Sequence, residues 1–312
     1  MKLHFKVFAP FLLSLFLGLF FASCDNSSTP VTPDADVTEP TNLQAYADDG
    51  KIGLTWTLSV SESQSNFGTY ELTYWETGTS GNTQVANIQK GSSSYTITGL
   101  VNGKRYTAQL RSKTTAGKTS AGYATIEWSP AVRNSTDMNG QVINLYATTS
   151  AQPKSGMVFK NGSNQCEILS QAGADWANRG DIYFFAQSNT SQVLSIKSAH
   201  LATGNPGSKT TYFSTMSYDV DDMNASNAQS APPALSTYTT TSIDFIDQAS
   251  AKSKVYWGRI QGLGADAAST YTVRFIVMKG ANGKLIQGSA ADRFITLQVS
   301  VQPVAGNPYA KK

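Results

Sequence analysis

The chain has 312 residues, of which only 14% are charged, and its formal net charge is +3. So small a net charge argues against nucleic acid or another strongly anionic macromolecule as a partner. The abundance of Ser, Thr, Gly and Asn and the scarcity of helix-favouring runs are typical of an all-β extracellular protein.

The amino terminus has the pattern of a secretory signal that ends at a cysteine. Lys2 and Lys6 supply positive charge, and residues 7–21 form an apolar run that is too short and too broken for a membrane span of about 20 apolar residues. Two small residues and then Cys24 follow this run. An ordinary cleaved signal and an uncleaved anchor are the alternatives to a lipoprotein signal, and all three send the rest of the chain out of the cytoplasm.

Residues 19–24, which read LFFASC, resemble a bacterial lipobox, with Phe21 where that family usually has Leu. The resemblance implies cleavage after residue 23 and lipidation of the Cys24 thiol, and therefore a lipid-anchored protein of the bacterial cell envelope. We expect the lipid to anchor the protein in the outer membrane, and exposure on the cell surface is one option. Acyl chains contribute about 0.8 kcal/mol per buried CH₂, so two or three would hold the chain to a membrane without any further apolar segment.

The mature chain that follows from this signal begins with a tether. Residues 24–37 are rich in Pro, Ser, Thr and Asp and contain no aromatic residue, so we expect them to be disordered. Loss of Lys2 and Lys6 reduces the 24 basic side chains to 22, against 21 acidic ones. With Cys24 lipidated, Cys166 is the only other cysteine, which excludes a disulfide within the folded part.

Residues 38–131 show the period-two alternation of β-strands. Apolar and polar residues alternate on both sides of the turn at Asp49 and Gly50, and Trp56 belongs to the second of the two strands. Tyr70, Leu72 and Tyr74 form the next apolar stripe. Further strands are predicted at 84–89, 94–98 and 106–110.

These strands resemble those of a fibronectin type III domain. Trp56 matches the buried tryptophan of the family's second strand, and the stripe at 70–74 matches the third. The run Tyr95-x-Ile97-x-Gly99-Leu100, followed by Tyr106, matches the crossing that carries the tyrosine corner. The resemblance implies structural roles for Trp56, Leu100 and Tyr106, with the Tyr106 hydroxyl bonded to backbone upstream. Because residues 38–131 lack the Arg-Gly-Asp tripeptide by which some domains of this family bind integrins, a spacer or a generic contact module is the expected role of this domain.

Residues 135–312 predict a second all-β domain, a sandwich or jelly-roll-like fold of roughly nine strands. An Asn282-Gly283 pair predicts a hairpin turn between the last two of them. The tyrosine-corner pattern does not recur, so this domain is not a second fibronectin repeat. The predicted strands are 142–147, 156–159, 181–187, 192–201, 211–220, 239–246, 254–263, 270–278 and 293–301.

The closing strands of this domain, Val255–Ile260 and residues 271–302, resemble those of surface lipoproteins of Bacteroidota, some of which capture haem (the HmuY type). In the haem binders, the axial ligands are pairs of His or Met from loops. His200 is the only histidine of the mature chain, which excludes ligation by two histidines within one chain. Axial ligation of haem by His200 together with Met216 or Met223 remains conceivable. Capture of haem or another small ligand is therefore one alternative function.

Signals for catalysis are weak. A nucleophilic Ser or Cys needs a base, and no Gly-x-Ser-x-Gly elbow accompanies the single histidine. Metal clusters of the His/Cys kind lack ligands. A glycan-active enzyme with a fibronectin spacer is a second alternative, because a glycosidase needs only two carboxylates and this domain contains Asp175, Asp181, Asp219, Asp221, Asp222, Asp244 and Asp247.

One acidic segment has oxygen ligands suited to calcium, at Asp219, Asp221, Asp222 and Asn224. It lacks the glycine and the distal glutamate of an EF-hand loop, so a solvated acidic turn is the commoner explanation.

The sequence thus predicts a non-catalytic cell-envelope lipoprotein without a cofactor, which presents a binding or adhesion surface to a glycan, a protein or extracellular matrix. The expected contact residues are Trp176, which lies in a polar stretch between Asp175 and Asn178, and Trp75, which lies beside a core stripe and must face outward. We expect most other aromatic residues in the cores.

Overall fold

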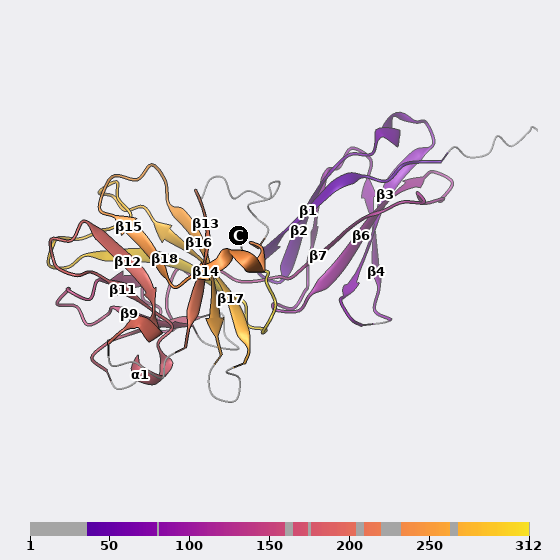
Figure 1. Cartoon of the computed structure of the whole chain (residues 1–312). Coiled ribbons are helices and arrows are strands. Elements are labelled where there is room, and N and C mark those ends of the chain that lie inside the picture. Colours follow the sequence, from indigo (N-terminus) through magenta and orange to yellow (C-terminus); the bar gives the residue numbers. More distant parts are fainter. Residues whose placement is uncertain are drawn as a thin grey trace, which may run out of the picture. The chain divides into compact units, whose positions relative to one another are not determined.

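The structure is a computed structural model that describes residues 36–79, 81–159, 165–173, 176–203, 209–219, 232–262 and 268–311. Within these residues the strands form four antiparallel sheets, and the protein is all-β, as the sequence predicts (Figure 1). Two sheets lie in residues 41–128 and two in residues 144–301. No helix of the described part is long and apolar enough to cross a membrane.

The first sandwich has a three-stranded and a four-stranded sheet. The smaller sheet has the order β1-β2-β5, with β1 at Thr41–Asp48, β2 at Lys51–Thr57 and β5 at Ser94–Ile97. The larger has the order β4-β3-β6-β7, with β4 at Gln84–Gln89, β3 at Phe67–Glu76, β6 at Tyr106–Thr114 and β7 at Ala124–Trp128. A short 3-10 helix, η1, spans Val60–Ser63.

Alternate side chains of the two sheets form the core of this sandwich. Trp56 is buried and packs edge-on against Tyr70, with their ring centroids 5.8 Å apart. The Tyr70 hydroxyl accepts a hydrogen bond from the Ser59 N–H at 2.9 Å. Tyr106 is also buried, and its hydroxyl accepts from the Val101 N–H at 3.1 Å, which ties the strand β6 to the turn before it.

The second sandwich has a five-stranded and a six-stranded sheet. The first has the order β10-β9-β11-β12-β15, with β10 at Cys166–Leu169, β9 at Gly156–Phe159, β11 at Ile182–Phe185, β12 at Val193–Ser198 and β15 at Ser242–Ile246. The second has the order β14-β13-β16-β17-β18-β8, with β14 at Tyr238–Thr240, β13 at Thr211–Asp219, β16 at Lys254–Gln261, β17 at Thr270–Met278, β18 at Phe294–Val301 and β8 at Asn144–Tyr146.

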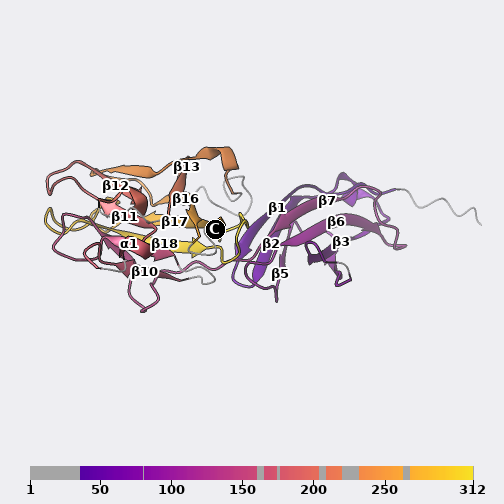
Figure 2. The ribbon, with the colours of Figure 1, turned by 60° about the horizontal axis from the view of Figure 1, so that its bottom comes forward.

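The helices of this sandwich are short: α1 at Trp176–Arg179, η2 at Ala199–Leu201 and η5 at Leu235–Thr237. Both views show α1 beside the five-stranded sheet (Figures 1 and 2). The sequence predicts neither α1 nor β10, and the single strand expected at 239–246 is divided between β14 and β15, which belong to different sheets. The turn at Asn282 and Gly283 is present, with Gly283 at φ 76°, but it lies within a longer connection between β17 and β18.

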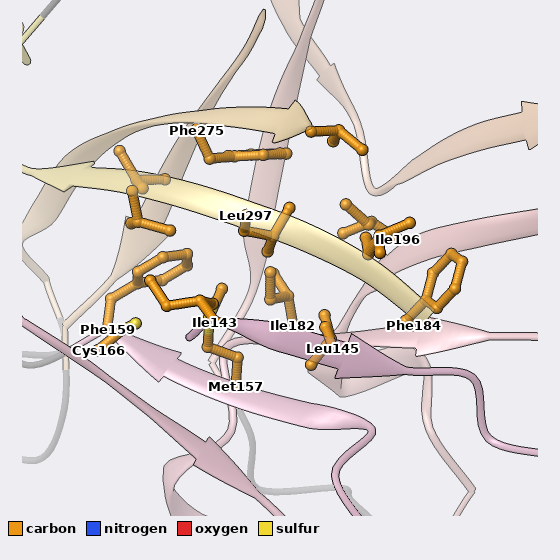
Figure 3. Packing of buried hydrophobic residues seen from close by; sticks show 14 of the residues in the cluster. Ile143, Leu145, Met157, Phe159, Cys166, Ile182, Phe184, Ile196, Phe275 and Leu297 are labelled. Carbon is orange, nitrogen blue, oxygen red and sulfur yellow. The ribbon is translucent and has the colours of Figure 1, made fainter. Parts of the chain in front are cut away.

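The core of the second sandwich fills the space between its two sheets. Met157, Phe159 and Phe184 point from the five-stranded sheet toward Phe275 and Leu297 of the other (Figure 3). Each of these side chains is at most 1% exposed. Cys166 lies in the same core as a free thiol, and burial raises its pKa to about 12.

Candidate functional site

A pocket of about 630 Å³ lies on the outer face of the five-stranded sheet. Side chains alternate across a strand, so Ile182 and Phe184 of β11 enter the core while Tyr183 and Phe185 face outward. Lys197 of β12 pairs directly with Tyr183 and therefore stands on the same face. The lining includes Gln171, Trp176, Tyr183, Phe185, Lys197, Leu201 and Thr203.

Trp176 forms the inner wall of this pocket. Its side chain is only 4% exposed and packs edge-on against Tyr183, with ring centroids 6.1 Å apart. The indole occupies the space above two glycines, because a Cβ at Gly156 or at Gly180 would lie 2.4 Å from Trp176 Cζ3. Trp176, which the sequence places in a polar loop, thus begins the helix α1 and closes the pocket from behind rather than projecting into solvent.

Lys197 gives the pocket a positive charge. Its Nζ lies 3.8 Å from the centroid of the Phe185 ring, which is a cation–π contact. No carboxylate of the described residues forms an ion pair with Lys197, and none of the described residues that line the pocket is an acid. Asp244, on the neighbouring strand β15, accepts hydrogen bonds from the Ser195 and Ser242 hydroxyls instead.

The rim of the pocket follows η2, which Asp181 connects to the rest of the sheet. The Asp181 carbonyl accepts from the Ala199 N–H at 3.0 Å and from the Thr211 hydroxyl at 2.9 Å. Its carboxylate forms an ion pair with Lys209, and both side chains are almost completely buried. Burial raises the pKa of Asp181 to about 6, although Lys209 opposes this shift. Leu201 projects from the rim, 45% exposed.

A second pocket, of about 370 Å³, lies on the first sandwich and includes Trp75. Trp75 is half-buried, and the lining also includes Tyr74, Asn82 and Gln84. Glu76 in this pocket is paired with Lys104, so its charge is already balanced. This pocket is smaller than the one at Trp176, and its described lining residues carry no unpaired charge.

Four of the aspartates considered for a catalytic pair have other partners in the described part of the chain. Asp181 and Asp244 have the partners given above, Asp219 pairs with Lys254, and Asp247 pairs with Lys284. No group of three or more His, Cys, Asp or Glu side chains that could hold a metal occurs among the described residues. Of the other candidates, Asp175, Asp221, Asp222, Met223 and Asn224 lie outside the described residues.

The histidine and methionine considered for haem already have protein partners. His200 Nδ1 lies 2.8 Å from the Ser198 hydroxyl, and the Met216 sulfur accepts from the Tyr218 hydroxyl at 3.5 Å. The residues that sequence reasoning missed are Lys197 and Phe185. A lysine in a strand reads as a solvated charge, and only the pairing of β11 with β12 shows that it stands over an aromatic ring.

Comparisons with known proteins identify the first sandwich. The family described as Fibronectin type III domain matches residues 38–128. No curated protein matches the chain. Among similar solved structures, a β-sandwich protein from a computer-based redesign is 12% identical, with 29% of this chain and 87% of that chain covered and a TM-score of 0.26. A structure described as a myokine is 9% identical, with 30% and 97% covered and a TM-score of 0.25, and similarities this low carry no functional argument.

Proposed function

We propose that this chain, with its fibronectin type III domain at residues 38–128, is a lipid-anchored protein of the bacterial cell envelope that presents a non-catalytic binding pocket. In this proposal Cys24 carries the lipid, the fibronectin domain is a spacer, and the second sandwich binds the ligand. Support for the anchor comes from the sequence around Cys24, which reads as a signal followed by two small residues.

The observation that carries the binding role is the pocket at Lys197. Ligand sites are concave and largely apolar, with a few polar groups that orient the ligand. This pocket combines aromatic walls at Trp176 and Phe185 with one lysine that lacks an acidic partner among the described residues. The described residues of its lining include no Asp, Glu, His or Cys to act with Lys197 and Tyr183 as an acid–base pair, and binding is the chemistry that this lining supports best.

The test of the pocket uses the full chain purified in detergent, a glycan array and a haem titration. Phe185→Ala removes a half-buried ring from the pocket and should abolish binding of any ligand found. Tyr123→Ala is the matched control, because Tyr123 is 45% exposed and lies under Arg111 at 4.6 Å in the other sandwich. A ligand whose affinity falls equally in both variants contradicts the assignment, as does turnover of a polysaccharide that is lost on mutation of an aspartate.

The test of the anchor is metabolic labelling with palmitate in a bacterial host. The full-length chain should take up the label and the Cys24→Ala variant should not. Equal labelling of the two would refute the lipoprotein assignment.

A further inference from the structure

The charge of the pocket restricts the ligand. Among the described residues of the lining, Lys197 is the only charged side chain, and the Phe185 ring beneath it excludes water from one side of the ammonium group. A charge that is partly shielded from water interacts more strongly with an opposite charge. The nearest acidic side chain by strand register, Asp244, is engaged by two serines. An anionic group on the ligand would therefore complete an ion pair that the described residues do not supply.

The remaining lining restricts the body of the ligand. Leu201, Ala202 and the edge of Phe185 are apolar. The side chains of Gln171 and Thr203 form no hydrogen bond within the described part of the chain and offer both donors and acceptors. A ligand with a face of C–H groups could contact the apolar side chains while its hydroxyls form hydrogen bonds with Gln171 and Thr203. An acyl chain would leave these two polar side chains unpaired.

The size of the pocket fits such a ligand. Its volume of about 630 Å³ lies within the range of about 300–1,000 Å³ that is usual for small-ligand sites. We propose that the pocket binds an acidic saccharide, with the carboxylate at Lys197 and the sugar ring between Phe185 and Leu201. This inference rests on the binding role proposed above and names the ligand class of that same pocket.

The experiment compares acidic saccharides with neutral counterparts of the same size. Isothermal titration calorimetry on the full chain in detergent would use trigalacturonate with its methyl ester, and 3′-sialyllactose with lactose. Dodecanoate serves as an anion without hydroxyls. We expect binding of at least one acid, little binding of its neutral counterpart, and a weaker affinity at 1 M than at 0.01 M salt, where the Debye lengths are about 3 and 30 Å.

Variants of Lys197 assign the effect to this pocket. Lys197→Gln should weaken binding of the acid by about tenfold or more, and Lys197→Arg should restore most of it because the charge is kept. Lys90→Gln is the matched control, since Lys90 also lies over a phenylalanine, at 5.7 Å from the Phe67 centroid, in the other sandwich. The affinity of Lys90→Gln for the acid should equal that of the parent.

Other outcomes separate this inference from the proposed function. If a ligand depends on Phe185 but binds Lys197→Gln as tightly as the parent, the pocket function stands and the acidic saccharide falls. Equal binding of acid and neutral counterpart, binding of dodecanoate alone, or no binding of either acid also overturns the inference. If no ligand of any kind depends on Phe185, the binding role itself is refuted.

Discussion

Asp181 and Lys209 form an ion pair that is almost fully removed from water, with side chains 0% and 3% exposed. Desolvation of two charges costs about as much as their attraction returns, so such a pair adds little net stability. Loss of one partner is different, because an uncompensated charge then stays in the interior. The pair also holds the segment that carries η2, since the Asp181 carbonyl accepts from both Ala199 and Thr211.

Lys209→Met should therefore destabilise the protein by about 3–5 kcal/mol at pH 7.5. The pKa of Asp181 is already raised by burial to about 6, so its contribution to stability is present at acid pH and lost as the pH rises through 6. Without Lys209 this pKa rises further, and the deficit should be smaller at pH 5, where the carboxyl is protonated. Urea unfolding of the parent and of Lys209→Met at pH 5 and at pH 7.5 measures this difference in the free energy of unfolding.

The control for this prediction is Lys254→Met, which removes the partner of Asp219 from a pair whose side chains are 36% and 28% exposed. An exposed pair contributes about 0–1 kcal/mol, so this variant should unfold almost like the parent. An equal loss in both variants, or a deficit of Lys209→Met that does not depend on pH, would show that the buried charge is not the cause.

Arg274 on β17 is a buried charge without a hydrogen-bond partner among the described residues. It is 2% exposed, none of its three guanidinium nitrogens has a partner in this part of the chain, and its Cζ lies 5.0 Å from the centroid of the Trp257 ring. Burial, with a smaller effect of the charge on Arg133, lowers its pKa to about 9. The charged form is thus costly at neutral pH, and Arg274→Met should leave the free energy of unfolding unchanged or raise it.

Arg293→Met provides the opposite expectation for an equally buried arginine. Arg293 is 4% exposed and donates to the Ser188 and Ser191 carbonyls at 2.6 and 2.5 Å. Its loss removes two hydrogen bonds from a charged donor, each of which contributes about 1.5–3 kcal/mol. Chemical denaturation of both variants tests these two predictions. If Arg274→Met lowers the free energy of unfolding by several kcal/mol, the guanidinium of Arg274 has a partner.

At the scale of elements, the first sandwich depends on the contact between β2 and β3. Trp56 is 5% exposed and lies across Tyr70, which is fully buried. Truncation of a buried aromatic residue costs about 3–5 kcal/mol, a large share of the 5–15 kcal/mol that stabilises a typical domain. Trp56→Ala should lower the melting midpoint of this sandwich severely, while Tyr123→Ala, at an exposed ring, should not. A parent-like melting curve for Trp56→Ala would contradict its role in the core.

The strands of the first sandwich, apart from β7, which the sequence did not predict, were the easier to predict because its core faces alternate cleanly. Ile52, Leu54 and Trp56 are all buried, as are Tyr70 and Leu72, so period-two patterning and burial coincide. In the second sandwich, β17 is buried on both faces, and β10 is only four residues long. Short strands and strands buried on both faces carry a weak alternation, which explains why β10 and the division between β14 and β15 escaped prediction.

The candidate site was harder to predict than the fold because it depends on register. Trp176 stands out as an aromatic residue in a polar stretch, but its burial follows from the absence of side chains at Gly156 and Gly180. Lys197 becomes a ligand candidate only because β12 pairs with β11 so that it reaches the Phe185 ring. Sequence periodicity indicates on which face of a strand a residue lies. Which residues stand beside it on the neighbouring strands depends on the register of strand pairing.

For the whole molecule, the two cysteines report on the state of the chain. Cys166 is 1% exposed and burial raises its pKa to about 12, so its thiol should not react with a thiol-directed dye while the protein is folded. If Cys24 is acylated, the native protein should show no reactive thiol and the unfolded protein one. A reactive thiol in the native protein isolated from membranes, which Cys24→Ser removes, would contradict acylation at that position.

The same burial of Cys166 makes the molecule suitable for spectroscopy at the pocket rim. A cysteine introduced by Leu201→Cys, at a position 45% exposed, would be the only thiol open to a fluorescent or spin label in a folded chain whose Cys24 is acylated or replaced by serine. A label there would stand beside the pocket without a background signal from the core. Ligand entry would then be observable directly, as a change in polarity or mobility of the probe, in detergent or on membrane vesicles.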